Sequence, residues 1–190
     1  MSLLIPLAPP LWASDEAFWV LRLGYDDGGD RLIRGIDADG DSDTLEAGTA
    51  GYVEAGIMAR LGVNPSQDSP ITLPIDLEIN LGFKSDQIED DQISGGDVSF
   101  ERWTITGIAW WRIGKLRTGF GPVIHFDPVI HFEGSGANLG TDSTFGATAL
   151  VDYTVLGAVQ MGARATMMDY SSDTGKSSAD AVGVYMGFQF

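Results

Sequence analysis

Residues 71–83 read Ile-Thr-Leu-Pro-Ile-Asp-Leu-Glu-Ile-Asn-Leu-Gly-Phe, and this stretch decides the fold. Every odd-numbered residue in it is apolar, whereas the even-numbered positions hold Thr, Pro, Asp, Glu, Asn and Gly. A period of two predicts a β-strand, because successive side chains of a strand point to opposite faces, whereas a helix repeats at three and four residues. At about 3.3 Å per residue and a tilt near 40°, the run is long enough to cross a bilayer core.

Seven further segments alternate in the same way. They are residues 18–25, 51–61, 100–112, 116–126, 145–153, 159–167 and 182–190. The connections between the segments are alternately long and short. The long, polar ones are residues 26–45, 85–98, 134–142 and 171–178, and the short ones are 62–67, 114–115 and the bend near 156–157. This pattern predicts an all-β fold, an eight-stranded antiparallel up-and-down transmembrane β-barrel with both termini at its short-turn end.

Composition agrees with one membrane-sized barrel domain. The chain has 190 residues, of which 44% are hydrophobic, and 25 glycines, yet no run approaches the roughly 20 consecutive apolar residues of a membrane helix. It has no cysteine, which excludes disulfides and thiolate metal sites. The net charge of −16 disfavours nucleic acid as a partner, because phosphate binding needs clustered Lys and Arg.

The first 13 residues are set apart from the barrel. Residues 1–13 read MSLLIPLAPPLWA, an apolar run that ends in a small residue before a polar start. This resembles the back half of a secretory signal peptide, although the basic first region is missing. We therefore expect residues 1–13 to be a signal-peptide remnant or an N-terminal arm, and residues 14–190 to be the barrel.

The predicted inner face carries charges of both signs. They are Arg22, Glu54, Arg60, Asp76, Glu78, Arg117, Asp127 and Arg164. Side chains fill the inside of an eight-stranded barrel, so these groups should pair in a polar lumen. A soluble, lipocalin-like ligand-binding barrel would instead hold its apolar face inside and expose these charges to water, and this alternative stays open.

Aromatic residues favour the membrane, because they gather near the predicted strand ends, as interfacial girdles do. They are Trp19, Tyr25, Trp103, Trp111, Tyr153, Tyr170 and Phe190. The chain also ends in an alternating apolar strand, Val-Tyr-Met-Gly-Phe-Gln-Phe over residues 184–190. This ending resembles the C-terminal assembly signal of bacterial outer-membrane barrels, in which a final Phe, here Phe190, follows an aromatic residue two places earlier, here Phe188.

With the strand count, the region from about residue 16 to 190 resembles the small OmpA/OmpX-like barrels. The resemblance implies a porin-like architecture in the outer membrane of a Gram-negative bacterium. It also implies contact with outer-membrane lipid and lipopolysaccharide, and recognition of the last strand by the barrel-assembly machinery. Pro74 and Pro122 depart from the pattern, since a proline breaks the hydrogen-bond ladder of a closed sheet, and they suggest bulges.

One duplicated segment carries the best chemical constellation. Pro-Val-Ile-His-Phe occurs at residues 122–126 and again at 128–132. Because the offset of six is even, His125, Asp127, His131 and Glu133 should share the inner side if the strand has no bulge. Histidine beside a carboxylate suits acid–base chemistry or a divalent metal, and the nearby Ser135 would suit a hydrolase. The competing interpretation is a hydrogen-bond network of the lumen or rim.

Asp37, Asp39, Asp41 and Asp43 alternate as calcium ligands do. The EF-hand order is absent, because Ser42 and Gly48 stand where Gly and Glu are needed. A solvated acidic loop is the simpler interpretation, with Ca²⁺ as the alternative and no other cofactor expected.

The sequence thus predicts a non-enzymatic outer-membrane protein with a structural or surface-interaction role, a side-chain-filled lumen and acidic extracellular loops. The enzymatic alternative is a lipid-directed hydrolase that uses His125 or His131.

Overall fold

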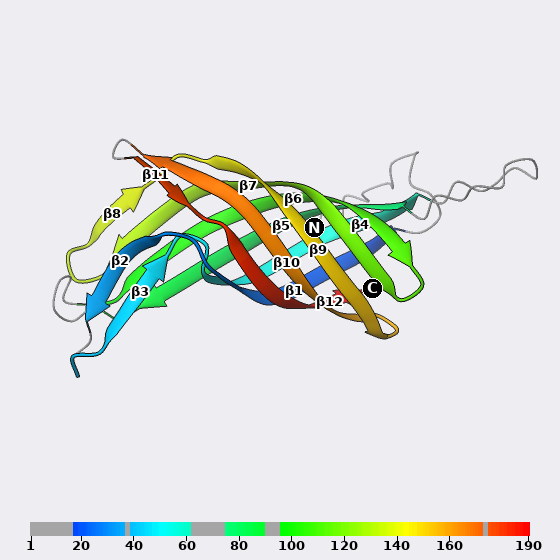
Figure 1. Ribbon diagram of the computed structural model, residues 1–190, viewed down its shortest axis with the longest axis horizontal. Helices are drawn as coiled ribbons and strands as arrows, with labels where there is room; N and C mark the ends of the chain where they lie inside the picture. The colour runs from blue at the N-terminus through cyan, green and yellow to red at the C-terminus, as the bar shows by residue number, and fades with distance from the viewer. Residues whose placement is uncertain (1–16, 37–38, 62–74, 90–95, 173–174) are drawn as a thin grey trace, which may run out of the picture.

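The computed structural model describes residues 17–36, 39–61, 75–89, 96–172 and 175–190, so the expected N-terminal segment 1–13 lies outside it. Eight long strands form the wall (Figure 1). They are β1 (Ala17–Asp27), β4 (Ala50–Leu61), β5 (Ile75–Ile88), β6 (Val98–Ile113), β7 (Leu116–Phe132), β9 (Thr144–Leu156), β10 (Val159–Ser172) and β12 (Ala181–Gln189). Each pairs antiparallel with the next, and β12 pairs with β1. The predicted closed barrel is confirmed.

The connections differ more from the sequence-based expectation than the wall does. Four short strands lie in the long connections and lengthen one end of the barrel (Figure 1). They are β2 (Arg31–Ile36), β3 (Ser42–Glu46), β8 (Ala137–Gly140) and β11 (Gly175–Ser178). At the other end, Gly114 and Gly157 take the positive φ that the tight turns need. The predicted turn at 62–67 and the first four residues of the strand predicted at 71–83 lie outside the part of the chain that is described.

The outer surface of the barrel is an apolar belt. On β5, Leu77, Ile79 and Leu81 are 46%, 60% and 50% exposed, whereas Asp76, Glu78 and Asn80 between them are buried. The other wall strands alternate with the same sense, apolar outward and polar inward. A lipocalin-like barrel needs the reverse arrangement, so the soluble alternative is wrong. Within the described residues, no helix is long and apolar enough to span a membrane.

The aromatic residues follow the expectation with two exceptions. Exposed rings lie near the strand ends at Trp19, Tyr25, Trp111, Tyr153 and Phe190, whereas Trp103, which is also exposed, is the sixth residue of β6. Tyr170, however, is buried inside the barrel, with 3% of its surface exposed. The outward positions of β10 are odd-numbered, so the position of Tyr170 in the alternation places it with the inner residues Gln160 and Arg164.

A charge placed in the belt should be costly. We expect Ile79→Arg to lower the free energy of unfolding by about 2–4 kcal/mol, because a guanidinium at the middle of a bilayer loses its hydration. Urea titration of protein folded into lipid vesicles would measure the loss. Leu139→Arg on β8, beyond the belt, is the matched control. Equal stability of the Ile79→Arg variant and the parent would contradict a lipid-facing belt.

The strand β7 contains one irregularity that the sequence pattern did not locate. The pairing with β6 runs through Trp103–Phe126 but continues at Glu101–Val129, so β7 holds one extra residue there. Asp127 lies at this bulge with φ of 54°, a left-handed conformation that few non-glycine residues adopt. At Pro122, by contrast, the register does not shift. The bulge expected at Pro122 is therefore at Asp127, and Pro74 lies outside the described residues.

Candidate functional site

The barrel interior contains ion pairs, several of which link strands that are not neighbours in the wall. Arg22 of β1 holds both carboxylate oxygens of Glu78 of β5, and its Nη2 donates to Oε2 at 2.7 Å. The same carboxylate accepts hydrogen bonds from Trp110 Nε1 at 2.8 Å and from Asn80 Nδ2 at 2.6 Å. Because the Glu78 carboxylate accepts from four donors, its negative charge is compensated although it is buried. These side chains fill the lumen at this level.

A second group joins four further strands, β7, β9, β10 and β12. Arg117 of β7 binds Asp152 of β9 through Nε at 2.8 Å and Nη2 at 2.6 Å. Tyr185 of β12 donates its hydroxyl to the same carboxylate at 3.2 Å, and Gln160 accepts from Arg117 at 3.0 Å. The planar guanidinium matches the carboxylate in a two-pronged pair, which fixes both side chains between the neighbouring strands β7 and β9.

The third group lies around Asp26. Arg164 Nε donates to Asp26 Oδ1 at 2.8 Å, and Lys84 Nζ donates to Oδ2 at 2.6 Å. Arg164 also donates to Glu54 Oε1 at 2.6 Å and lies over the ring of Tyr52, 3.6 Å from its centroid. All these side chains are buried. Side chains therefore occupy the interior at this level as well, and the described residues form no open pore there.

The structure places most of the predicted lumen charges inside. Arg22, Glu54, Asp76, Glu78, Arg117 and Arg164 are buried, and Arg60 is half-exposed at 3.9 Å from Asp76. Asp127 is the exception, because the bulge turns it to the exposed surface.

Sequence reasoning missed four interior charges. They are Asp26, Lys84, Arg102 and Asp152. The alternation of each strand already places these residues on the inner face. Asp26, for example, lies four residues after Arg22 and on the same face of β1, but it was assigned to the acidic connection that follows.

The histidine constellation is not assembled. His125 is buried inside the barrel, where its Nδ1 lies 2.5 Å from the Tyr170 hydroxyl. His131 points outward, with Nδ1 2.9 Å from Asn138 Oδ1 and Nε2 3.7 Å from Glu101. The expectation of a shared face is wrong, because the extra residue at Asp127 reverses the alternation between the two histidines.

The neighbouring candidates also lie away from the lumen. Glu133 and Ser135 follow β7 in the hairpin to β8, where Ser135 Oγ accepts from the backbone N–H of Ala137 at 3.2 Å. The Ser–His–acid arrangement considered above is therefore not formed with His125.

The acidic loop shows no assembled metal site. Among the described residues, no group of three or more His, Asp or Glu side chains is close enough to hold a metal ion. Asp39 and Asp41 flank the tip of the β2–β3 hairpin, Asp43 lies on β3, and Asp37 is outside the described residues. Asp43 Oδ1 accepts from the N–H of Thr44 at 2.7 Å.

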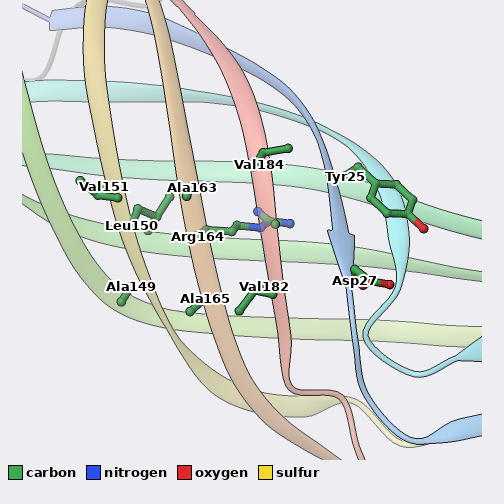
Figure 2. Close-up of a pocket in the computed structure, with 11 residues that line it drawn as sticks. Tyr25, Asp27, Ala149, Leu150, Val151, Ala163, Arg164, Ala165, Val182 and Val184 are labelled. Atoms are coloured by element: carbon green, nitrogen blue, oxygen red, sulfur yellow. The ribbon is translucent and has the colours of Figure 1, made fainter.

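The outer face has a hollow of about 690 Å³ where β9, β10, β12 and β1 run side by side (Figure 2). Ala163 and Ala165 of β10 lie between Ala149 and Val151 of β9 on one side and Val182 and Val184 of β12 on the other, and Tyr25 lies beyond β12. The small side chains explain the hollow, since they leave the wall thin between larger neighbours. It belongs to the apolar belt, which lipid covers.

Comparisons with known proteins agree with this geometry. No family model matches the chain, and no curated protein matches it. Among solved structures, it is similar to Ail, the attachment invasion locus protein of Yersinia pestis, crystallised with the heparin analogue sucrose octasulfate. The identity is 12%, the TM-score 0.51, and the match covers 92% of this chain and 99% of Ail. It is also similar to Neisserial surface protein A, with 11% identity, a TM-score of 0.52, and coverage of 92% and 97%.

The chain has the fold of the small outer-membrane β-barrels. At these identities the likeness concerns the fold alone. The apolar belt is the surface by which such a barrel sits in the outer membrane. In this barrel the last strand closes the wall, because Trp19 and Phe190 exchange backbone hydrogen bonds at 2.8 and 3.1 Å. Phe188, two residues earlier, pairs with Leu21.

Proposed function

We propose that this outer-membrane barrel is not an enzyme and that it acts through its acidic outer loops, with its lumen closed by side chains. The distribution of charge supports this role most directly. Seven of the 11 basic residues lie in the lumen or at its mouth, whereas the chain has 27 acidic residues in all. The seven are Arg22, Arg60, Lys84, Arg102, Arg112, Arg117 and Arg164. Five of the 27 acidic residues are buried in the lumen with them, fewer than the seven basic residues, so the rest of the chain is more acidic than the net charge of −16 indicates.

This charge distribution sets the class of partner. An acidic rim attracts cationic surfaces and repels sulfated or phosphorylated ones, since unlike charges steer association and like charges oppose it. The sulfated ligand of Ail is a property of that protein. For this chain we propose basic protein segments as partners of the loops. Divalent cations, Ca²⁺ among them, would bridge the rim to lipopolysaccharide. We also propose that Phe188 and Phe190 are recognised by the barrel-assembly machinery.

The geometry does not favour the hydrolase alternative. His125 and His131 lie on opposite faces of β7, so a site could use one of them but not both together. His131 has Glu101 at 3.7 Å and Ser99 as its cross-strand partner, but among the described residues neither histidine forms a hydrogen bond with a serine hydroxyl, which an acyl-transfer site requires.

Binding to charged polymers tests the surface role. The protein in nanodiscs should bind immobilised poly-L-lysine, with affinity that falls as salt rises, and should not bind heparin. Replacing Asp39, Asp41 and Asp43 together by Asn should weaken the poly-L-lysine binding severalfold and leave the barrel folded. Heparin binding by the parent protein, or unchanged poly-L-lysine binding by the triple variant, would contradict the proposal.

A further inference from the structure

The first long connection folds over the mouth of the barrel. Within it, Leu45 of β3 and Ala47 are completely buried, and Leu32 and Ile33 of β2 pack against apolar side chains of the inner wall. Figure 1 shows β2 and β3 at the same end of the molecule as β8 and β11. The hairpin therefore acts as an apolar cover over this end, where the lumen changes from polar to apolar.

A cavity of about 480 Å³ remains beside this cover. Most of its lining is apolar, and comes from β2, β6, β7, β8 and β10. The residues that carry the argument are Leu32, Ile33, Phe100, Ile130, Leu139 and Tyr170. This volume lies in the range of sites that bind small molecules.

The cavity is bounded on two sides by strands that do not pair with each other. Lower in the wall, β9 lies between β7 and β10, but it begins only at Thr144. Beyond that point β8 pairs with β7 on one side, and β11 pairs with the end of β10 on the other. In the described residues, β8 forms no ladder with β10, and Thr144 Oγ1 reaches the carbonyl of Asp169 across the gap. Gly140 and Thr141 line the cavity from one side of this gap, and Tyr170 and Ser177 from the other.

This side gap lies at the edge of the apolar belt. Phe145, the residue after Thr144, faces outward and is 69% exposed. A molecule dissolved in the outer leaflet therefore reaches the gap without crossing the acidic loops.

The cavity ends blindly. Phe100 and Tyr170 meet edge to face below it, with ring centroids 5.7 Å apart. Behind these rings, Arg102 lies 4.5 Å from the Phe100 ring, and His125 contacts the Tyr170 hydroxyl. The aromatic pair thus separates the cavity from the charged lumen, so the cavity is a binding site and not the entrance of a channel.

Polar groups in the lining limit the ligand. The Thr141 hydroxyl is a buried oxygen without a hydrogen-bond partner among the described residues. A ligand that forms a hydrogen bond with this oxygen would remove the cost of leaving it unpaired. Arg31 in the lining disfavours a cation, and the acidic rim disfavours an anion. We infer that the cavity binds a small, uncharged, largely apolar molecule with one hydrogen-bonding group, which enters from the outer leaflet. This role is independent of the proposed binding by the acidic loops.

Methyl NMR of the whole protein in nanodiscs tests the site. The probe is N-phenyl-1-naphthylamine, which is neutral, mostly apolar and carries one N–H. Its titration should shift the methyl signals of Ile33 and Ile130 and reach saturation. Ile79 and Ile105 in the belt report partition of the probe into lipid, which does not saturate. Shifts confined to the belt residues would overturn the inference.

Two further arms test the location and the charge preference. Leu139→Trp fills the cavity from an exposed strand and should raise the dissociation constant about tenfold or more. Leu156→Trp, an exposed leucine at the opposite end of the barrel, should leave it unchanged. The sulfonated analogue, 1-anilinonaphthalene-8-sulfonate, should bind more weakly than the neutral probe. Equal binding by the Leu139→Trp variant, or tighter binding of the sulfonate, would overturn the proposed site or its preference for an uncharged ligand.

Discussion

Replacing Arg164 by methionine should lower the free energy of unfolding by about 3–5 kcal/mol, because it removes one partner of a buried ion cluster. The guanidinium of Arg164 is the group that joins Asp26 to Glu54. In its absence Lys84 still neutralises Asp26, but Glu54 keeps only Arg22, at 4.0 Å. A carboxylate left in the lumen with so little compensation makes the folded state less favourable.

Urea titration in lipid vesicles, followed by the fluorescence of the five tryptophans, would measure this loss. Arg60→Met is the matched control. Arg60 also pairs with a carboxylate, but its side chain is 36% exposed and the N–O distance is 3.9 Å, so its loss should cost less than about 1 kcal/mol.

A double variant separates lost charge compensation from lost packing. Arg164→Met combined with Glu54→Leu removes the stranded carboxylate as well, and should recover part of the stability. Equal losses for Arg164→Met and Arg60→Met would contradict the view that the buried cluster holds the wall together.

The wall could be predicted from sequence because one physical rule governs it. Lipid outside and a narrow polar lumen inside impose alternation on every strand, so a run such as residues 75–83 shows its structure locally. The same alternation also predicts that Asp26, Lys84, Asp152 and Tyr170 face the lumen, where the structure places them. Asp26 was missed because it was assigned to the acidic connection, and Tyr170 because it was assigned to the girdle. Lys84 lies one residue beyond the predicted end of its strand, and Asp152 lies on the inner side of the predicted strand 145–153, where its charge was not recognised.

The rim could not be predicted in the same way. The β2–β3 hairpin is held by packing against side chains such as Phe100 and Ile130, which are far away in sequence. Its own alternation is short and rich in charge, which is also typical of a solvated loop. The bulge in β7 is equally hidden, since a single extra residue leaves no compositional trace.

Deleting Asp127 should exchange the two faces of the outer end of β7. Without the extra residue, the pairing with β6 runs on in one register, which turns His131 inward and Ile130 outward. The chain has no cysteine, so single cysteines at these two positions are clean reporters. In the parent barrel, His131→Cys should react with a membrane-impermeant maleimide and Ile130→Cys should be protected. In the deletion variant the order of reactivity should be reversed.

Two substitutions keep this test decisive if the deletion lowers the yield of folded barrel. Asp127→Gly should keep the labelling pattern, because glycine accepts a φ of 54° without strain. Asp127→Val should lower the free energy of unfolding by about 1–3 kcal/mol, because a β-branched residue is strained there. Heat-modifiable migration on gels would report which variants are folded. A folded deletion variant that still labels only at residue 131, or a valine variant as stable as the glycine variant, would show that the bulge does not set the two faces. In that case the separation of His125 from His131 would need another cause.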